Sequence, residues 1–290
     1  MAEKLVILAG GISSRMRKPP KSTAGVDRKL MEDAEHKPKS MIGVGTAGRP
    51  FMDYLLINAR EVGYRDVVIV VGEKDESIRN HYGTKDRDNA FYGLTISYAL
   101  QTIPRGRSRP LGTADALLCA LQLRQDWKGQ TFTVCNSDNL YSREALRLMM
   151  ESPYPNALVD YDQSALGFQQ SRVEKFAVTK KDDDGYLIDI IEKPTPEQID
   201  SVKDRAGTIG VSMNIFRLNY DMILPCLERI PLHPDRQEKE LPIAVIMMIR
   251  DHPRSCYAHP LKEHVPDLTS RDDIAVVQAY LEREFKNISF

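Results

Sequence analysis

The sequence predicts an α/β fold, in which a doubly wound, mostly parallel, Rossmann-like sheet carries a smaller mixed portion. Short apolar runs alternate with amphipathic stretches through the first half, and one run, Val67–Val71, consists of β-branched residues alone. Buried parallel strands have this composition, and strand–helix alternation is typical of doubly wound sheets. After Asn156 the alternation gives way to a hairpin pattern, which indicates the mixed portion.

The elements of the first half have clear boundaries. Gly63 can end the helix that starts at Phe51, and the Ser142 hydroxyl can accept from free amides in the first turn of a helix that starts at Arg143. In chain order we expect the strand Lys4–Leu8, the helix Phe51–Val62, the strand Val67–Val71, the helix Thr113–Leu123, the strand Thr131–Cys135 and the helix Arg143–Met150.

The second half is predicted from turn residues and from helical spacing. Asp184-Gly185 is a hairpin-turn pair, and Pro242 suits the first turn of a helix. The expected elements are the strands Glu174–Thr179, Tyr186–Glu192 and Thr208–Phe216, two helices between Asp221 and Ile249, and a final helix Ser270–Phe285 capped by Ser270.

Composition and charge limit the kinds of partner and the cellular location that the sequence predicts. The 290 residues carry a net charge of −1, with 28% charged and 42% hydrophobic residues, which predicts a soluble globular protein without a nucleic-acid partner. The N-terminal apolar run is too short for a secretory leader, and no stretch approaches the roughly 18 apolar residues of a membrane span. The four cysteines are widely scattered, so we expect free thiols and a cytoplasmic location.

A glycine turn follows the first strand: Leu8-Ala9-Gly10-Gly11-Ile12-Ser13-Ser14-Arg15-Met16. Paired glycines let backbone amides approach an anion, and the carboxyl end of a parallel strand is the usual ligand position in an open sheet. Arg15 adds a guanidinium suited to phosphate oxygens. The spacing is neither that of a P-loop nor G-x-G-x-x-G. On the glycines alone, a tight turn with a surface arginine is the alternative to a phosphate site.

This turn and several later motifs resemble the sugar nucleotidyltransferase family, the NDP-sugar pyrophosphorylases. The motifs follow in the family order over nearly the whole chain: Pro38-Lys39-Ser40-Met41, Gly48-Arg49-Pro50-Phe51, Leu111-Gly112-Thr113-Ala114, Asn136-Ser137-Asp138, Glu192-Lys193-Pro194 and Asp267-Leu268-Thr269-Ser270-Arg271-Asp272-Asp273-Ile274. The resemblance implies that a nucleoside triphosphate and a sugar 1-phosphate give an NDP-sugar and pyrophosphate. It also implies one domain over residues 1–290, with a nucleotide-binding half near 1–150 and a sugar-binding and C-terminal half near 151–290.

The resemblance assigns roles to single residues. Arg15 and Lys39 are the expected catalytic cations, on the leaving phosphates and on the α-phosphate respectively. Asp138 and Asp267 are the expected ligands of Mg²⁺, an ion that takes few carboxylates together with phosphate oxygens and water. Nucleotide contacts are expected from Leu8, Ala9, Gly10, Gly11, Gln101, Gly112 and Thr113, and contacts to the sugar or its phosphate from Gly167, Glu174, Glu192 and Lys193. A glutamine amide can pair with a pyrimidine edge, which favours a pyrimidine triphosphate.

One spacing departs from the family. The family lysine usually lies about ten residues or fewer beyond the arginine, whereas Lys39 lies 24 residues after Arg15. Lys21, in Pro20-Lys21-Ser22, is the competing match. Because an apolar segment, a Gly-x-Pro turn and a helix follow Lys39, we assign the role to Lys39. Residues 17–37 are polar, and we expect a flexible inserted loop that closes over the triphosphate.

Other functions stay open on the sequence: a transferase acting on a non-sugar phosphate, a metal-dependent glycosyltransferase, or a catalytically silent nucleotide-binding homologue. A glycosyltransferase favours Asp-x-Asp, whereas Asn136-Ser137-Asp138 supplies one carboxylate. The motif cations and carboxylates occur together, which disfavours a silent homologue. A homo-oligomer also stays open. Because the sequence ends at Phe290, no C-terminal β-helix or acyltransferase domain is expected.

Overall fold

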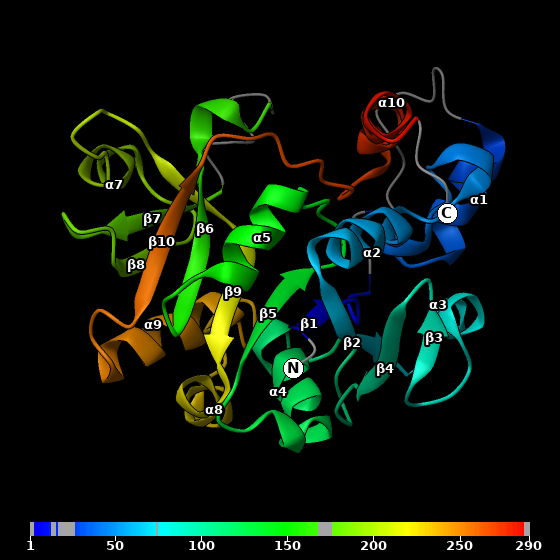
Figure 1. The fold of residues 1–290 in the computed structure, drawn as a ribbon, viewed down its shortest axis with the longest axis horizontal. Coiled ribbons are helices and arrows are strands. Elements are labelled where there is room, and N and C mark those ends of the chain that lie inside the picture. The colour runs from blue at the N-terminus through cyan, green and yellow to red at the C-terminus, as the bar shows by residue number, and fades with distance from the viewer. Residues whose placement is uncertain (1–2, 13–15, 17–26, 74, 168–175, 287–290) are drawn as a thin grey trace.

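The computed structural model describes residues 3–12, 16, 27–73, 75–167 and 176–286 (Figure 1). Its strands are β1 (Glu3–Leu8), β2 (Tyr64–Gly72), β3 (Asn89–Phe91), β4 (Leu94–Gln101), β5 (Thr131–Asn136), β6 (Asn156–Asp162), β7 (Ala177–Lys181), β8 (Leu187–Ile191), β9 (Gly210–Asn219) and β10 (Cys256–Leu261). Its α-helices are α1 (Arg28–His36), α2 (Phe51–Val62), α3 (Glu76–Tyr82), α4 (Thr113–Leu123), α5 (Arg143–Glu151), α7 (Pro196–Ser201), α8 (Tyr220–Arg229), α9 (Leu241–Asp251) and α10 (Ile274–Glu284). Its short 3-10 helices are η1 (Lys39–Met41), η2 (Thr46–Gly48), η3 (Gln125–Trp127), η4 (Gln163–Ala165) and η5 (Arg271–Asp273).

The strands form one sheet in the order β10-β6-β9-β5-β1-β2-β4-β3, with β7 and β8 continuing from β9. The block β5-β1-β2-β4 is parallel throughout. Beyond β5 the sheet is mixed, because β9 pairs antiparallel with both β5 and β6, and β10 is parallel to β6. The predicted α/β fold is therefore confirmed, with its parallel pairs concentrated in the first half of the chain.

Helices cover both faces of the sheet, and two cores result. Leu5 and Ile7 of β1 belong to the core under α1, α2, α5 and α10, while Val6 and Leu8 belong to the core under α4, α8 and α9 (Figure 1). Successive strand residues point to opposite faces, so a strand with helices on both sides must be apolar at every position. This explains why the buried strands are continuous apolar runs in the sequence.

Most predicted elements are present. The helices Phe51–Val62 and Thr113–Leu123 have the predicted bounds. The Ser142 hydroxyl accepts from the Ala145 amide at 3.0 Å and caps α5. The predicted hairpin exists as β7 paired antiparallel with β8.

The segment expected to be a flexible loop is in part a packed helix. For Arg28–His36 the expectation of an irregular loop is wrong: these residues form α1, capped by Asp27. Leu30 and Ala34 are buried in a core, and the Gly43 amide donates to the Asp33 carboxylate at 3.3 Å. Two apolar side chains on one face thus suffice to dock a mostly polar helix. Residues 17–26, including Lys21, lie outside the described part of the chain.

The topology places a ligand position at the end of β1. From β1 the chain proceeds through β2 to β4 on one side, and then returns to β5 on the other side. Ligands of open α/β sheets bind outside the carboxyl ends of the strands at such a switch point. The Ser137 amide, just after β5, donates to the Leu8 carbonyl of β1 at 3.2 Å, so the two strand ends are joined there.

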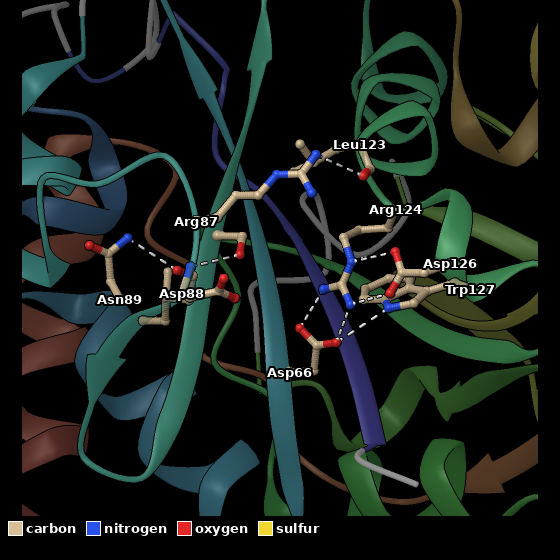
Figure 2. Close-up of polar contacts among 10 residues, drawn as sticks. Asp66, Arg87, Asp88, Asn89, Leu123, Arg124, Asp126 and Trp127 are labelled. Carbon is tan, nitrogen blue, oxygen red and sulfur yellow. Dashed lines mark hydrogen bonds and ion pairs between the residues drawn. The ribbon is translucent and has the colours of Figure 1, made fainter.

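The carboxyl end of α4 is anchored to the sheet by an ion pair (Figure 2). Arg124, which follows α4, donates from its two terminal nitrogens to the Asp66 carboxylate of β2 at 2.5 and 2.6 Å. Its guanidinium lies 4.4 Å from the centre of the Trp127 ring, and the Trp127 indole donates to Asp66 at 3.3 Å. This bidentate pair fixes the carboxyl end of α4 against the sheet, and so helps to fix the amino end at Thr113.

Two further observations concern the whole chain. None of the four cysteines forms a disulfide. Within the described ranges, no helix combines the length and the apolarity that a membrane crossing requires.

Candidate active site

The glycine turn lies at the carboxyl end of β1. The Ala9 amide donates to the Val70 carbonyl of β2 at 3.0 Å, which ties the turn to the sheet. A Cβ at Gly10 would lie 2.9 Å from Gln101 Oε1, too close for a side chain, whereas a Cβ at Gly11 would meet nothing within 4 Å. Gly10 is thus required by close packing, and Gly11 leaves the main chain open to a ligand. Arg15, the predicted phosphate cation, lies outside the described residues.

A cavity of about 440 Å³ opens beside this turn. It brings together ten of the residues that the sequence predicted for the site: Leu8, Ala9, Gly10, Gly11, Lys39, Gln101, Gly112, Thr113, Asp138 and Glu192. A second hollow of about 460 Å³ shares the turn, Pro38, Gln101 and Pro110 with the first, and reaches the start of α3. Segments far apart in the sequence therefore meet at one edge of the parallel sheet.

Lys39 and Asp138 form an ion pair in this cavity. Lys39 stands at the start of η1 and Asp138 just after β5, and each side chain is 18% exposed. Buried apolar neighbours, Met41 and Ile42, hold the η1 backbone in the core. The sequence assigned these two charges to different partners, a phosphate and a metal ion. The structure adds that they neutralise one another before a ligand arrives.

Asp138 and Asp267 come from opposite halves of the chain but lie on neighbouring backbone segments. The Leu268 amide donates to the Asp138 carbonyl at 2.8 Å, and Asn139 and Asp267 form an isolated β-bridge. Asp267 is 8% exposed and accepts from the Thr269 hydroxyl at 2.6 Å. The segment after β10 is thus fixed beside the segment after β5.

These carboxylates suit a hard divalent ion that the substrate also binds. The described residues contain no group of three or more histidines, cysteines or carboxylates placed to hold a metal ion. Two aspartates fall short of a complete protein site, but magnesium takes one or two carboxylates and completes its shell with phosphate oxygens and water. The residues present fit that mode of binding.

Gln101 ends β4 with its amide held in one orientation. Its nitrogen donates to the Gly112 carbonyl at 2.9 Å and to the Asp115 carboxylate at 2.8 Å, and the side chain is 3% exposed. Both amide protons are therefore used. The amide oxygen, beside Gly10, is the group that remains for a ligand.

The turn before α4 is clamped by a distant segment. Gly112 has a φ of +114°, and a Cβ there would lie 2.5 Å from the Lys239 carbonyl oxygen. The Ala114 amide donates to that same oxygen at 3.0 Å, and the Leu241 amide donates to the Thr113 hydroxyl at 2.9 Å. Glycine is thus needed at position 112 for both its conformation and its close contact.

The clamping segment also supplies charges that the sequence analysis missed. Arg236 pairs with Glu240 at 2.7 Å, and Glu238 pairs with Arg109 at 3.4 Å. Burial raises the pKa of Glu240, the Arg236 guanidinium opposes this shift, and the nearby Glu192 carboxylate adds to it. All five side chains line the cavity. In the sequence, the only indication of these site residues was the polar segment between the two predicted helices, in which acidic and basic residues alternate.

Asn214 is a further residue that the sequence analysis missed. It lines the cavity with a φ of +57°, inside β9. Left-handed backbone is uncommon outside glycine, and within a strand it redirects the side chain. Nothing in the local sequence distinguishes this asparagine from an ordinary strand residue.

Some predicted residues are not brought to the cavity. Gly167 packs against His264, whose ring nitrogen would lie 2.7 Å from a Cβ at that glycine. Lys193 has a φ of +49° and stands next to the cavity-lining Glu192. Neither Gly167, Lys193 nor Asp267 is among the cavity-lining residues. Glu174 lies outside the described residues.

Comparison with solved structures agrees with this fold. The chain is similar to a UDP-glucose pyrophosphorylase solved with UDP-glucose, with a TM-score of 0.69 and 17% identity over 98% of this chain and 100% of the other. It is equally similar to a UTP-bound UGPase from Acinetobacter baumannii, with a TM-score of 0.69, 18% identity and coverage of 99% and 98%. These likenesses define the class of fold, that of the UDP-glucose pyrophosphorylases.

The sequence comparisons define the family. The model of the family described as nucleotidyl transferase matches residues 23–261, and the chain belongs to this family. It is 24% identical to the bifunctional protein GlmU of Geobacter sulfurreducens, over 80% of this chain and 44% of that protein. It is 26% identical to the UTP--glucose-1-phosphate uridylyltransferase AglF of Haloferax volcanii, over 59% of this chain and 63% of that protein. The chain thus spans about half the length of such relatives.

Proposed function

We propose that this chain transfers a nucleoside monophosphate from a nucleoside triphosphate to a sugar 1-phosphate, giving an NDP-sugar and pyrophosphate. One observation carries the proposal: the glycine turn, Lys39, Asp138, Gln101 and Glu192 line a single cavity. Together they offer a main-chain phosphate turn, a cation, a metal carboxylate, a base-reading amide and a carboxylate for the acceptor. The names of relatives support it, since they include UTP--glucose-1-phosphate uridylyltransferase and glucose-1-phosphate thymidylyltransferase.

In the proposed reaction a phosphate oxygen of the sugar 1-phosphate attacks the α-phosphorus in line. The bond from the α-phosphorus to the bridging oxygen breaks, and pyrophosphate leaves with that electron pair. Such steps are catalysed by positioning and by stabilisation of developing charge. Lys39 holds the α-phosphate in this scheme, Arg15 the leaving phosphates and Lys193 the sugar phosphate. Because Lys39 pairs with Asp138, the ammonium exchanges a carboxylate for a phosphate when substrate binds.

Magnesium is the proposed cofactor, with Asp138 and Asp267 as its protein ligands. When bound, it supplies positive charge to the phosphates and polarises the reacting one. The charges that line the cavity support a requirement for a divalent cation. Its described lining carries four carboxylates and three cations: Asp138, Glu192, Glu238, Glu240, Lys39, Arg109 and Arg236. A triphosphate entering this excess of carboxylates requires additional cations.

The orientation of Gln101 supports a particular class of nucleobase. Its free oxygen accepts hydrogen bonds and its nitrogen is already committed to Gly112 and Asp115. Uracil and thymine present a ring N–H donor on the edge that pairs, whereas cytosine presents an acceptor at the same place. We therefore propose uridine or thymidine triphosphate as the preferred donor, in agreement with the pyrimidine expected from the sequence.

The acceptor side is proposed to bind a sugar through its hydroxyl groups. Glu192, Glu238 and Glu240 line the cavity near one another, and carboxylates accept hydrogen bonds from sugar hydroxyls. Arg236 pairs with Glu240 and Arg109 with Glu238, so two of these carboxylates have a cationic neighbour in the cavity wall. Gly167 and Glu174 stay predictions as sugar contacts.

The direct test is a panel assay for pyrophosphate release. The purified protein is incubated with magnesium, each of the common triphosphates, and a set of acceptors that contains hexose 1-phosphates, N-acetylhexosamine 1-phosphates and phosphocholine. Release is expected with UTP or dTTP and one sugar 1-phosphate, and none after chelation of the metal. Release with phosphocholine alone would move the assignment to a non-sugar acceptor. No release with any pair would leave a silent homologue.

The cellular setting is also a proposal. The absence of disulfides among the four cysteines supports a reducing compartment, and we infer a cytoplasmic location. A closing role over the triphosphate stays a prediction only for the part of residues 17–37 outside α1, and a homo-oligomeric state stays a prediction as well.

A further inference from the structure

Two asparagines lie at the facing ends of β5 and β9. The last residues that these antiparallel strands pair are Cys135 and Ile215, and the next residues are Asn136 and Asn214. Both asparagines line the cavity, and both are partly exposed. Among the described residues, both make their hydrogen bonds through the main chain alone, so both side-chain amides are available to a ligand.

The alternation of the strands points both amides into the cavity. Met213 and Ile215, on either side of Asn214, belong to the core under α1, α2, α5 and α10, so Asn214 points to the other face of the sheet. Asn136 shares its face with Val134, which belongs to the core under α4, α8 and α9. Residues in the first turns of α4 and α9 line the cavity too, so the cavity opens on this same face.

Asn214 occupies a strained position in a bulge of β9. Between two of the pairs that join β9 to β6, three residues of β9 face one residue of β6, and Asn214 is the middle one. Its φ of +57° costs free energy in any residue except glycine. The buried Tyr141 hydroxyl donates to the Met213 carbonyl at 2.7 Å and accepts from the Asn136 backbone amide at 3.4 Å. Bulges beside active sites re-aim a side chain, so the fold maintains this strain where a ligand contact would explain it.

The order of the strands separates these amides from the nucleobase. Gln101 ends β4, the glycine turn follows β1, and Asn136 ends β5. From β4 the sheet has three strand spacings to β5 and four to β9, which is about 14 and 19 Å. Glu192, proposed for the acceptor, follows β8, which joins β9 through β7. A triphosphate with its base at Gln101 and its phosphates at the glycine turn thus leaves Asn136 and Asn214 for the acceptor.

We propose that Asn136 and Asn214 determine specificity for the acceptor, and that their amides bind two neighbouring hydroxyl groups of the sugar. This inference rests on the proposed nucleotidyl transfer. A hydroxyl group both donates and accepts, and a carboxamide offers both functions, whereas a carboxylate only accepts. Two adjacent carboxamides therefore match two adjacent hydroxyls. A phosphate fits less well, because it offers acceptors alone and the Asp138 carboxylate stands on the same segment.

The test replaces each amide without disturbing the backbone. Asn214→Gly adopts the left-handed conformation without strain, so the free protein should melt at about the wild-type temperature. Asn136→Ala keeps the backbone bond to Tyr141. Pyrophosphate release is measured with UTP or dTTP, magnesium, and glucose 1-phosphate or the sugar 1-phosphate that the panel selects in its place. We expect each variant to lower kcat/KM for the sugar by about 3- to 10-fold, as the loss of one hydrogen bond does, and to leave KM for the nucleotide unchanged.

Monodeoxy analogues of the same sugar 1-phosphate identify a direct contact. In the wild-type protein, two analogues that lack adjacent hydroxyls should each react about 3- to 10-fold less well than the parent sugar. In Asn214→Gly one of these two losses should disappear, because that hydroxyl no longer has its partner. Asp88→Gly is the matched control. Asp88 has nearly the same conformation, with a φ of +58°, but does not line the cavity, so this variant should keep the wild-type constants.

The contrary outcomes are distinct from one another. Wild-type kcat/KM for the sugar in either variant would overturn the role of that asparagine and leave the proposed function intact. An equal loss with the parent sugar and with every deoxy analogue, or a raised KM for the nucleotide, would overturn the inference in favour of a structural role. If the wild-type protein releases no pyrophosphate with any pair in the panel, the proposed function itself fails, and this inference fails with it.

Discussion

Asp115→Asn should loosen the choice of nucleobase while leaving the fold intact. The Asp115 carboxylate accepts from the Gln101 amide nitrogen at 2.8 Å, and the Gly112 carbonyl accepts from the same nitrogen at 2.9 Å. Because both of these neighbours are acceptors, they fix the amide with its nitrogen toward them. Only the amide oxygen is then available to the base. An asparagine amide can donate as well as accept, and it therefore tolerates Gln101 in either orientation.

The size of the effect follows from the bond that is lost. A hydrogen bond to a charged group contributes about 1.5–3 kcal/mol, and the Gln101–Asp115 contact is partly buried. Turning the amide over in the wild-type protein forfeits this bond and sets the oxygen against a carboxylate. Removing that obstacle should reduce discrimination between uracil and cytosine by about 10- to 100-fold, since each 1.4 kcal/mol is about a factor of ten. The Gly112 carbonyl keeps a residual preference for the native orientation.

The assay measures pyrophosphate release with the sugar 1-phosphate that the panel identifies. The quantity compared is the ratio of kcat/KM for UTP to kcat/KM for CTP. The shift in melting temperature caused by each nucleotide gives the same comparison without an acceptor. Glu144→Gln is the matched control, because it removes a first-turn carboxylate from α5, outside the cavity. A wild-type ratio in Asp115→Asn would refute the idea that this carboxylate sets the orientation of Gln101.

Three further perturbations test the rest of the assignment. Lys39→Ala should lower turnover on the order of 10²-fold, as the loss of a transition-state contact does, while Lys21→Ala stays mild; the reverse result would mean that the insertion has been placed wrongly. Asp138→Asn should abolish metal-dependent turnover and weaken magnesium binding in calorimetry, with the fold intact by circular dichroism; full activity at saturating magnesium would contradict the metal role. Asp66→Asn should lower the free energy of unfolding by about 2 kcal/mol in urea titration, because it breaks the bidentate pair with the largely buried Arg124. An unchanged midpoint would contradict the anchoring of α4.

Local patterns predicted the elements that have a continuous or periodic apolar pattern in the sequence. The helix Phe51–Val62 is buried from Phe51 through Ala59 and ends at Gly63, whose φ of +127° suits glycine. Helix α1 was not predicted, because only Leu30 and Ala34 are buried and the rest of its surface is charged. The strand β10 was not predicted either, since it contains His259 and Pro260 and depends on pairing with β6.

The cavity residues also divide into those that local sequence motifs indicate and those that depend on distant contacts. Lys39, Gln101 and Asp138 were predicted from the family resemblance, and two of them also stand at strand ends, Gln101 at the end of β4 and Asp138 just after β5. Strand ends of a parallel sheet meet at one edge, which explains why these two residues line the same cavity. Arg236 and Glu240 were not predicted, because their place depends on a contact 128 residues apart, between the Leu241 amide and the Thr113 hydroxyl. No local pattern reports a contact of that span.

Arg271 shows why both ends of the chain are needed for one site. Its side chain is 9% exposed and donates from Nε to the Met16 carbonyl at 2.8 Å and from a terminal nitrogen to the Glu35 carboxylate at 3.2 Å. One guanidinium thus joins Met16, the last residue of the glycine turn, helix α1 and the segment that carries Asp267. A lysine could not make this fork, because it offers a point charge and no fixed geometry. The glycine turn and the predicted metal carboxylate are therefore positioned together, although about 250 residues of chain separate them.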